Sequence, residues 1–235
     1  MKRVLVLSIF LMSVAVIAQA QFQQFHVGAA FPSGKFADGN EKTESIYTSG
    51  KGFAATGITA GYKLYNMLSV ENMSWVFGIE IFFNPINSDL KDVLEKDWKD
   101  ITPLMYFNFP VTFGLNYAIP LNGEKMKLYG EAAIGANFSM LTDFVFENNK
   151  NNTTTTRYAN EKISTTPLFG FTYGLEVGLF INSKYSIGLR HNNLGSYKYK
   201  YEEEYESKSN IPSLKGKFDK ALPITITSLT VGVLF

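Results

Sequence analysis

Hydrophobic and polar residues alternate with a period of two over most of the chain, and the segment 224–235 shows this most clearly. Its sequence, ITITSLTVGVLF, places Leu229, Val231, Val233 and Phe235 on one face and small, mostly polar residues on the other. A period of two indicates a β-strand, because successive side chains of a strand point to opposite sides. A strand with one apolar face and an aromatic end is typical of a barrel that meets lipid.

Seven further segments alternate in the same way, so eight strands are predicted. The connections between them are alternately long and short, and an even strand number brings both ends of the chain to one side. The sequence therefore predicts an all-β fold: an eight-stranded antiparallel up-and-down transmembrane β-barrel with short periplasmic turns and four long extracellular loops. The other predicted strands are 22–32, 53–65, 68–84, 104–117, 126–141, 168–181 and 185–199.

The long connections differ in composition. The segment 85–102 contains LKDVLEKDWKD, a charged stretch with possible helical character, and 147–166 contains NNKNNTTTT, which is typical of a flexible exposed loop. The connections 33–52 and 200–222 are also long and polar. We expect all four to lie outside the barrel wall, where loops vary and carry binding functions.

The short turns predict how neighbouring strands pair. Two-residue turns at 122–123 and 66–67 would join the flanking strands, and Asn-Gly at 122–123 is a strong hairpin signal. Correct pairing must place inward residues opposite inward residues, and both turns satisfy that condition. The pairs that these turns predict are Gly114 with Glu131 and Lys63 with Val70.

The third short turn requires a different length. A two-residue turn near Asn182 would mismatch the faces, whereas a three-residue loop at 182–184 would pair Glu176 with Arg190. Pro110 lies in the middle of a predicted strand and has no N–H to donate. We therefore expect a β-bulge at Pro110.

The alternation fits two kinds of eight-stranded barrel. A soluble lipocalin-type barrel is apolar inside, whereas a membrane barrel is apolar outside. The polar faces carry many glycines, such as Gly170, Gly174 and Gly178, and the apolar faces carry Phe, Tyr, Leu and Ile. Small residues suit a narrow lumen and large apolar residues suit lipid, so the membrane barrel is favoured.

The N-terminal segment is typical of an export signal. Lys2 and Arg3 precede an apolar run at 4–17, and Ala-Gln-Ala at 18–20 resembles a cleavage site. We expect a signal peptide over 1–20, a barrel domain over 21–235, and a location in the cell outer membrane. The absence of cysteine excludes disulfides, thiolate metal sites and a cysteine nucleophile, and a net charge of +1 gives no reason to expect nucleic acid.

Several motifs resemble a known family. The stretches YFNFPVTFGLNY, LYGEAAIGANF and TSLTVGVLF, with the signal peptide and eight strands, resemble the small outer-membrane β-barrel proteins common in Bacteroidota, which are similar in architecture to the OmpX and OmpW groups. The resemblance covers the whole mature chain, and its motifs are structural. It implies a terminal Phe that the barrel-insertion machinery reads, and it implies little about activity, since one fold hosts unrelated functions.

Five charged residues fall on the predicted inward faces. Buried charges must be paired or hydrated. One interpretation is a salt-bridged plug that fills the lumen, and the other is a path for protons or ions. The plug is favoured because an eight-stranded interior is usually filled by side chains. These residues are Lys63, Glu80, Glu131, Glu176 and Arg190, with Glu131, Glu176 and Arg190 at one level, Glu80 nearer the loops and Lys63 nearer the turns.

Few residues could support catalysis or metal binding. His26 is predicted to point inward and His191 outward, and His191 could act only with a serine such as Ser139 or Ser196. No motif supports that arrangement, so no catalytic, cofactor-binding or metal-binding residue is assigned. The acidic run 202–204 could bind a divalent cation, although a solvated loop is commoner for such a run.

The sequence therefore predicts a monomeric, non-enzymatic outer-membrane barrel without cofactors. Its loops are expected to bind a surface ligand or a host or envelope protein, its wall to contact outer-membrane lipid, and its last strand to engage the insertion machinery. The main alternative is a narrow porin-like or OmpW-like conduit for small or apolar solutes. A more distant alternative is a membrane-embedded lipid hydrolase or acyltransferase.

Overall fold

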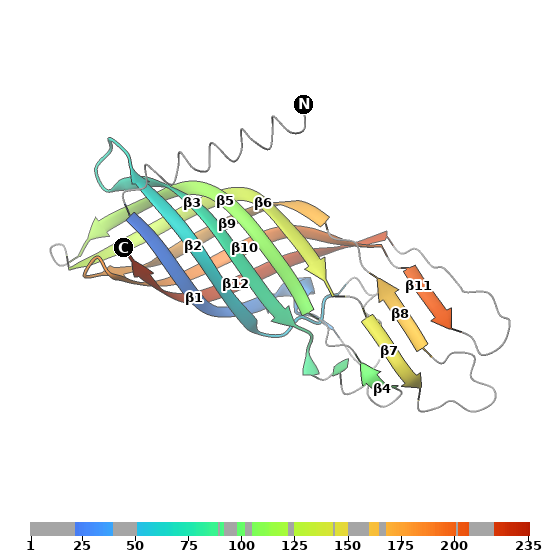
Figure 1. Cartoon of the computed structure of the whole chain (residues 1–235). Helices are drawn as coiled ribbons and strands as arrows, with labels where there is room; N and C mark the ends of the chain where they lie inside the picture. Colours follow the sequence, from blue (N-terminus) through green and yellow to red (C-terminus); the bar gives the residue numbers. More distant parts are fainter. Residues whose placement is uncertain are drawn as a thin grey trace.

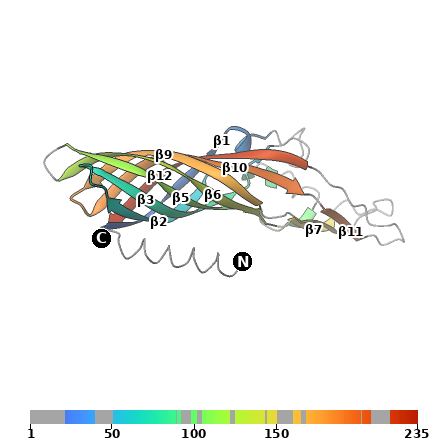
Figure 2. The ribbon, with the colours of Figure 1, turned by 90° about the horizontal axis from the view of Figure 1, so that it is seen from above.

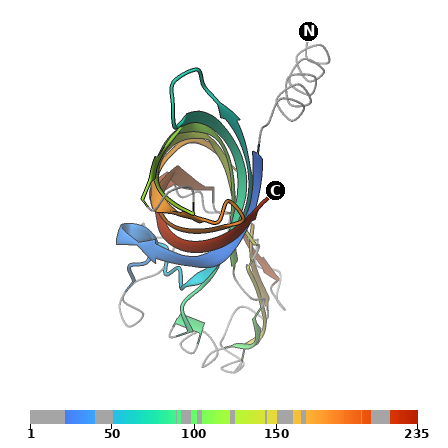
Figure 3. The same ribbon diagram turned by 90° about the vertical axis from the view of Figure 1, so that its left-hand side faces the viewer.

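In the described part of the chain, eight antiparallel strands close into a single barrel (Figures 1 and 3). The computed structural model describes residues 22–39, 51–88, 90–91, 98–101, 105–121, 125–142, 144–149, 160–164, 168–200, 202–206 and 219–235. The predicted fold class is confirmed. Around the barrel the order is β1-β12-β10-β9-β6-β5-β3-β2. The strands are β1 Phe22–Ser33, β2 Gly57–Met67, β3 Met73–Pro85, β5 Met105–Pro120, β6 Met126–Leu141, β9 Leu168–Ile181, β10 Tyr185–Lys200 and β12 Asp219–Leu234.

The first and last strands close the barrel, as the sequence predicts. Their pairing runs from Gln24 opposite Leu234 to Ser33 opposite Thr225. The backbone N–H of Gln23 also donates to the carbonyl oxygen of Phe235 at 2.8 Å. The last strand begins at residue 219 rather than 224, so it is longer than predicted.

The barrel wall is apolar outside and polar inside over most of its height. Phe171, Ile134 and Val231 point outward and are 64%, 59% and 54% exposed, whereas Asn137 and Ser228 point inward and are fully buried. A soluble protein rarely exposes so wide an apolar surface. The lipocalin-type alternative is therefore wrong for this wall, and the outer face suits lipid.

Two of the three hairpin registers differ from the prediction. Gly114 lies opposite Ala133, and Lys63 lies opposite Gly78. Both connecting loops are therefore longer than the predicted two-residue turns. Each shift is an even number of residues, so every side chain keeps its predicted face.

The third hairpin register is confirmed. Arg190 lies opposite Glu176, and the loop between β9 and β10 contains the three residues 182–184. Asn182 and Ser183 both have φ of 52°, in the left-handed region that non-glycine residues seldom adopt. The odd loop length thus places both charged partners on the inward face.

The predicted bulge at Pro110 is wrong. Pairing between β3 and β5 runs to Ile79–Val111 and resumes at Phe82–Asn108 in the same register. A bulge would add a residue to one strand and change that register. Pro110 instead interrupts the ladder locally, because it cannot donate a backbone hydrogen bond.

The described residues also form a second sheet of four strands, which the sequence does not predict. It lies beyond the end of the barrel from which the long connections leave (Figures 1 and 2). Three different connections supply its strands, in the order β11-β8-β7-β4. The strands are β4 Trp98–Ile101, β7 Phe144–Asn149, β8 Asn160–Ser164 and β11 Glu202–Glu206.

This sheet corrects three predictions about the connections. The charged stretch in 85–102 ends in strand β4, although Ser88, Leu90 and Lys91 are helical. The segment 147–166 contributes strands at both its ends, and the acidic run 202–204 lies in a strand rather than a loop. The Asn/Thr tract at 151–156 and the predicted signal peptide lie outside the described residues. Among the described residues, no helix is long and apolar enough to cross a membrane.

Candidate functional site

A cluster of charged side chains lies inside the barrel. Lys63 projects from β2, Glu80 from β3, Glu131 from β6, Glu176 from β9 and Arg190 from β10. None of the five is more than 7% exposed. The structure thus brings together all five charged residues singled out in the sequence, from five of the barrel strands.

Ion pairs connect these residues across the lumen. Lys63 Nζ lies 3.2 Å from a Glu131 oxygen and 2.5 Å from a Glu176 oxygen. Arg190 Nη1 lies 3.0 Å from Glu80, 3.6 Å from Glu131 and 3.7 Å from Glu176. Glu80 lies opposite Gly61 and Lys63 opposite Gly78, so the two residues leave the wall at different heights. Their long side chains nevertheless meet at one centre.

The Arg190 guanidinium is held by charge more than by aligned hydrogen bonds. Its Nε donates to Asn192 Oδ1 at 2.9 Å. Its Nη1 and Nη2 have no hydrogen-bond partner at favourable angles among the described residues, despite the nearby carboxylates. Removing either base would leave buried carboxylates uncompensated, which is costly in a low-dielectric interior.

His26 also belongs to this charged cluster, although the sequence analysis left it out. Its Nε2 lies 3.0 Å from Glu80 Oε1, and the residue is 2% exposed. Three carboxylates thus face two basic side chains and one histidine. The alternation along the first strand already places His26 on the inward face. Its pairing with Glu80 depends on closure of the barrel, which the alternation does not describe.

Two tyrosines contribute hydrogen bonds to the carboxylates of Glu131 and Glu176. Tyr129 donates to Glu176 Oε1 at 2.6 Å, and Tyr65 donates to Gln24 at 2.8 Å and lies 3.3 Å from Glu131 Oε2. The sequence analysis named neither tyrosine. Alternation places both on the inward face, but it does not show which acceptor each hydroxyl would reach. Hydrogen bonds to charged groups are stronger than those between neutral groups, so the tyrosines stabilise the buried carboxylates.

Glycines make room for these large side chains. A Cβ at position 61 would lie 2.5 Å from His26 Nε2, and one at position 188 would lie 2.6 Å from both Glu176 Oε1 and Tyr129 Oη. These inward glycines therefore lie beside large polar side chains of the lumen. Gly61 and Gly188 are required for space.

A layer of amides lies between the charged cluster and the loop end of the barrel. Asn137 donates through its Nδ2 to Ser139 at 2.7 Å and to the Leu194 carbonyl at 3.0 Å. Ser139 donates to Asn108 Oδ1 at 2.8 Å. Ser139 is thus held inside the lumen by two amides.

The loop end of the lumen is apolar. Phe36, from the short helix η1 Gly34–Phe36, and Phe53 are almost fully buried there. Phe36 packs edge-on against Tyr106 at 4.8 Å, and the Tyr106 hydroxyl donates to the Gly52 carbonyl at 2.9 Å. Phe36 and Phe53, from the described ends of the connection between β1 and β2, therefore pack inside the barrel, and Phe53 is not the start of a strand as predicted. The inward residues of this apolar plug include Ala30, Phe82, Leu141, Leu194, Leu222, Ile224 and Ile226.

Aromatic rings fill the other end of the lumen. Phe22 stacks on Tyr65 at 4.4 Å between ring centroids, and Phe180 stacks on Tyr129 at 4.2 Å. Both tyrosines also bond to the charged cluster. The lumen is therefore layered, with aromatic, charged, amide and apolar layers from the short turns to the loops.

The described residues do not assemble the catalytic pair considered for His191. His191 points outward and contacts Thr227 Oγ1 at 3.0 Å, whereas Ser139 points into the lumen. The barrel wall therefore separates His191 from Ser139, and no contact joins His191 to the exposed Ser196 among the described residues. Within the same described part, no three His, Cys, Asp or Glu side chains are grouped to hold a metal ion.

Comparisons with solved structures give distant likenesses, and no curated protein matches the sequence. Similar solved structures include Neisserial surface protein A, at 10% identity over 91% of this chain and 94% of that chain with a TM-score of 0.48. Ail of Yersinia pestis is 12% identical over 91% of this chain and 98% of that chain, with a TM-score of 0.45. A major outer membrane protein from Thermus thermophilus is 11% identical over 91% of this chain and 99% of that chain, with a TM-score of 0.47.

A family model gives the assignment directly. The model described as "Outer membrane protein beta-barrel domain" matches residues 4–232, nearly the whole chain. The closed barrel, its apolar outer wall and its polar lumen are the features that such a family requires. The chain belongs to the outer membrane protein beta-barrel domain family, and its location is the outer membrane.

Proposed function

We propose that this protein is a non-enzymatic outer-membrane barrel that binds a partner through the sheet at its loop end. The observation that carries the proposal is that sheet, which three separate connections build together beyond the barrel. Ordering several connections into one sheet costs conformational entropy, and a binding surface is a reason to keep it.

The pairing of this sheet suggests how a partner would bind. In the described residues, β4 pairs only with β7, and β11 pairs only with β8. Within this described part each leaves one strand edge unpaired, and an unpaired edge can accept a further strand. The β11 edge has the sequence EEEYE, and its charge opposes uncontrolled self-association. The protein would act as a monomer, with a surface ligand or a host or envelope protein as partner.

Replacing the β7–β8 hairpin tests this proposal. A variant with residues 144–164 exchanged for a short Gly/Ser linker should keep the barrel, since these strands pair outside it. Wild type and variant in nanodiscs would be screened against a panel of glycans and secreted proteins. Binding lost only in the variant supports the proposal, and equal binding by both proteins contradicts it.

The main alternative is a conduit for small or apolar solutes. Buried ion pairs, amides and apolar side chains occupy successive layers of the lumen, and this favours a plug. We expect no stepwise conductance when the wild-type barrel is inserted into planar bilayers. A stable single-channel conductance would support the conduit instead.

The last strand is proposed to guide insertion into the membrane. Leu229, Val231, Val233 and Phe235 point outward and are 49%, 54%, 48% and 66% exposed. This apolar row is available to the insertion machinery before β12 pairs with β1. The Phe235→Ala variant should accumulate less folded barrel in the outer membrane, while refolding into detergent in vitro stays unchanged.

A further inference from the structure

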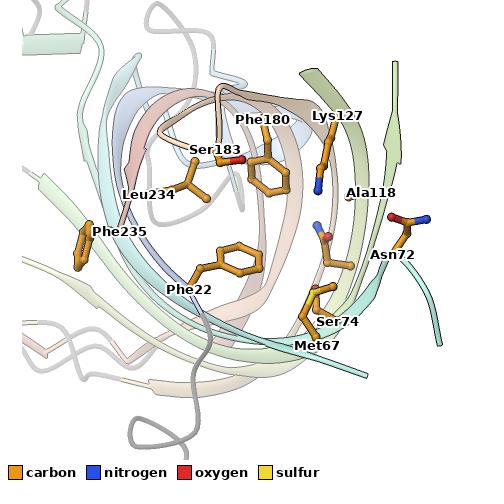
Figure 4. Close-up of a pocket in the computed structure, with 11 residues that line it drawn as sticks. Phe22, Met67, Asn72, Ser74, Ala118, Lys127, Phe180, Ser183, Leu234 and Phe235 are labelled. Atoms are coloured by element: carbon orange, nitrogen blue, oxygen red, sulfur yellow. The ribbon is translucent and has the colours of Figure 1, made fainter. Parts of the chain in front are cut away.

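A cavity of about 260 Å³ opens at the short-turn end of the barrel, away from the loop-end sheet. Its volume lies near the lower limit of small-ligand pockets, roughly 300 Å³. The residues around it come from β1, β2, β3, β5, β6, β9 and β12, so most of the barrel mouth contributes. Figure 4 shows Phe22, Phe180, Leu234 and Lys127 around a shared space.

One side of the cavity is apolar. Phe22, Phe180 and Leu234 face the space from three strands (Figure 4). The rings of Phe22 and Phe180 are fixed by stacking on Tyr65 and Tyr129, which are hydrogen-bonded to the charged cluster. A rigid apolar wall of this kind favours an aliphatic or aromatic group over water.

The other side of the cavity carries hydrogen-bond donors. Ser74 and Asn116 lie opposite each other on β3 and β5, and each is 2% exposed. The Nδ2 of Asn116 has no hydrogen-bond partner among the described residues.

A cation stands at the rim on the same side. Lys127 directs its amine toward the cavity (Figure 4) and forms no ion pair within the described part of the chain. The rim is therefore suited to an anionic group.

We propose that this mouth binds an amphiphile with one acyl chain and an anionic head group. The chain would lie against Phe22, Phe180 and Leu234, and the head group would pair with the amine of Lys127 at the rim. The volume suits one short chain and excludes a two-chain lipid. Short turns of outer-membrane barrels face the periplasm, so the ligand would come from the periplasm or the inner leaflet.

The test uses the full-length barrel in phosphatidylcholine nanodiscs, with [1-13C]decanoate as the probe. Decanoate bound to the barrel should give a carboxyl resonance distinct from that of decanoate in nanodiscs without protein. The intensity of this resonance should saturate as decanoate is added. Lys127→Met should weaken binding about tenfold, since it removes a charged hydrogen bond. Lys125→Met, a rim lysine that does not line the cavity, should stay within twofold of wild type.

A second variant tests the apolar side. Ala118→Phe would fill the cavity and should abolish saturable binding, provided that the variant keeps the heat-modifiable gel mobility of a folded barrel. Displacement of decanoate by a lysophosphatidylglycerol would identify an anionic lipid as the source, and its failure would favour a free fatty acid. The absence of saturable binding, or equal binding by Lys127→Met and Lys125→Met, would overturn the proposal.

Discussion

The two halves of the lumen follow opposite rules, and strand β12 shows the change within a few residues. Toward the short turns, Ser228 and Thr230 point inward while Leu229 and Val231 point outward and are about half exposed. Toward the loops, Ile224 and Ile226 point inward and are fully buried, while Thr225 and Thr227 point outward. Along β12 the lumen therefore changes from polar to apolar toward the loops.

The neighbouring strand shows the same change. On β10, Arg190 and Asn192 point inward and Leu189 outward, but further along Leu194 points inward and Asn193 outward. On these two strands the outward face therefore becomes polar where the lumen becomes apolar. Phe31, Ile58 and Phe169 still point apolar side chains outward beside the same plug, so the outward reversal belongs to part of the wall. The apolar plug packs like the core of a soluble protein.

The largest effect is expected from the charged half of the lumen. Arg190→Ala leaves Glu80, Glu131 and Glu176 with Lys63 as the remaining strong base near them. Breaking a buried ion pair on one side costs about 3–5 kcal/mol. Urea unfolding in lipid vesicles should show that loss.

The matched control for Arg190→Ala is His191→Ala, the next residue, which points outward. It should change the unfolding free energy by less than about 1 kcal/mol. Adding Glu80→Gln to Arg190→Ala should recover part of the lost stability, because it removes one uncompensated charge. An Arg190→Ala barrel as stable as wild type would show that the charges do not hold the lumen together.

A slightly smaller effect is expected in the apolar half. Ile226→Ala removes buried methyl groups from the plug that contains Phe36, and such changes cost about 2–4 kcal/mol. Thr225→Ala, on the outward face of the same strand, should cost less than about 0.5 kcal/mol. Equal losses for the two variants, measured by the same urea unfolding, would mean that the loop half has no core of its own.

The smallest effect locates the boundary between the halves. Val231→Arg places a charge in lipid and should cost about 2 kcal/mol, whereas Thr227→Arg should cost less than about 1 kcal/mol near the interface.

The chain contains no cysteine, so Thr227→Cys and Val231→Cys can each be labelled alone. A membrane-impermeant maleimide should react with the first of these variants and leave the second unmodified. Reaction at both positions, or at neither, would remove the proposed boundary.

Much of the barrel follows from local pattern. The eight strands, their faces and the Glu176–Arg190 pairing are predictable, because a period of two and a loop of odd length are properties of neighbouring residues. The inward position of Lys63 and Glu80 is predictable for the same reason. Their actual partners are not, since Lys63 reaches Glu176 across the lumen from a strand far away in the sequence.

The sequence by itself determined which side of each strand faces the lumen, because alternation is set by the backbone of each strand alone. Only the tertiary structure decided the rest. It set the longer hairpin loops, the folding of Phe36 into the barrel and the joining of three connections into one sheet. These depend on contacts between distant segments and on where lipid gives way to water, and no local pattern of residues records either.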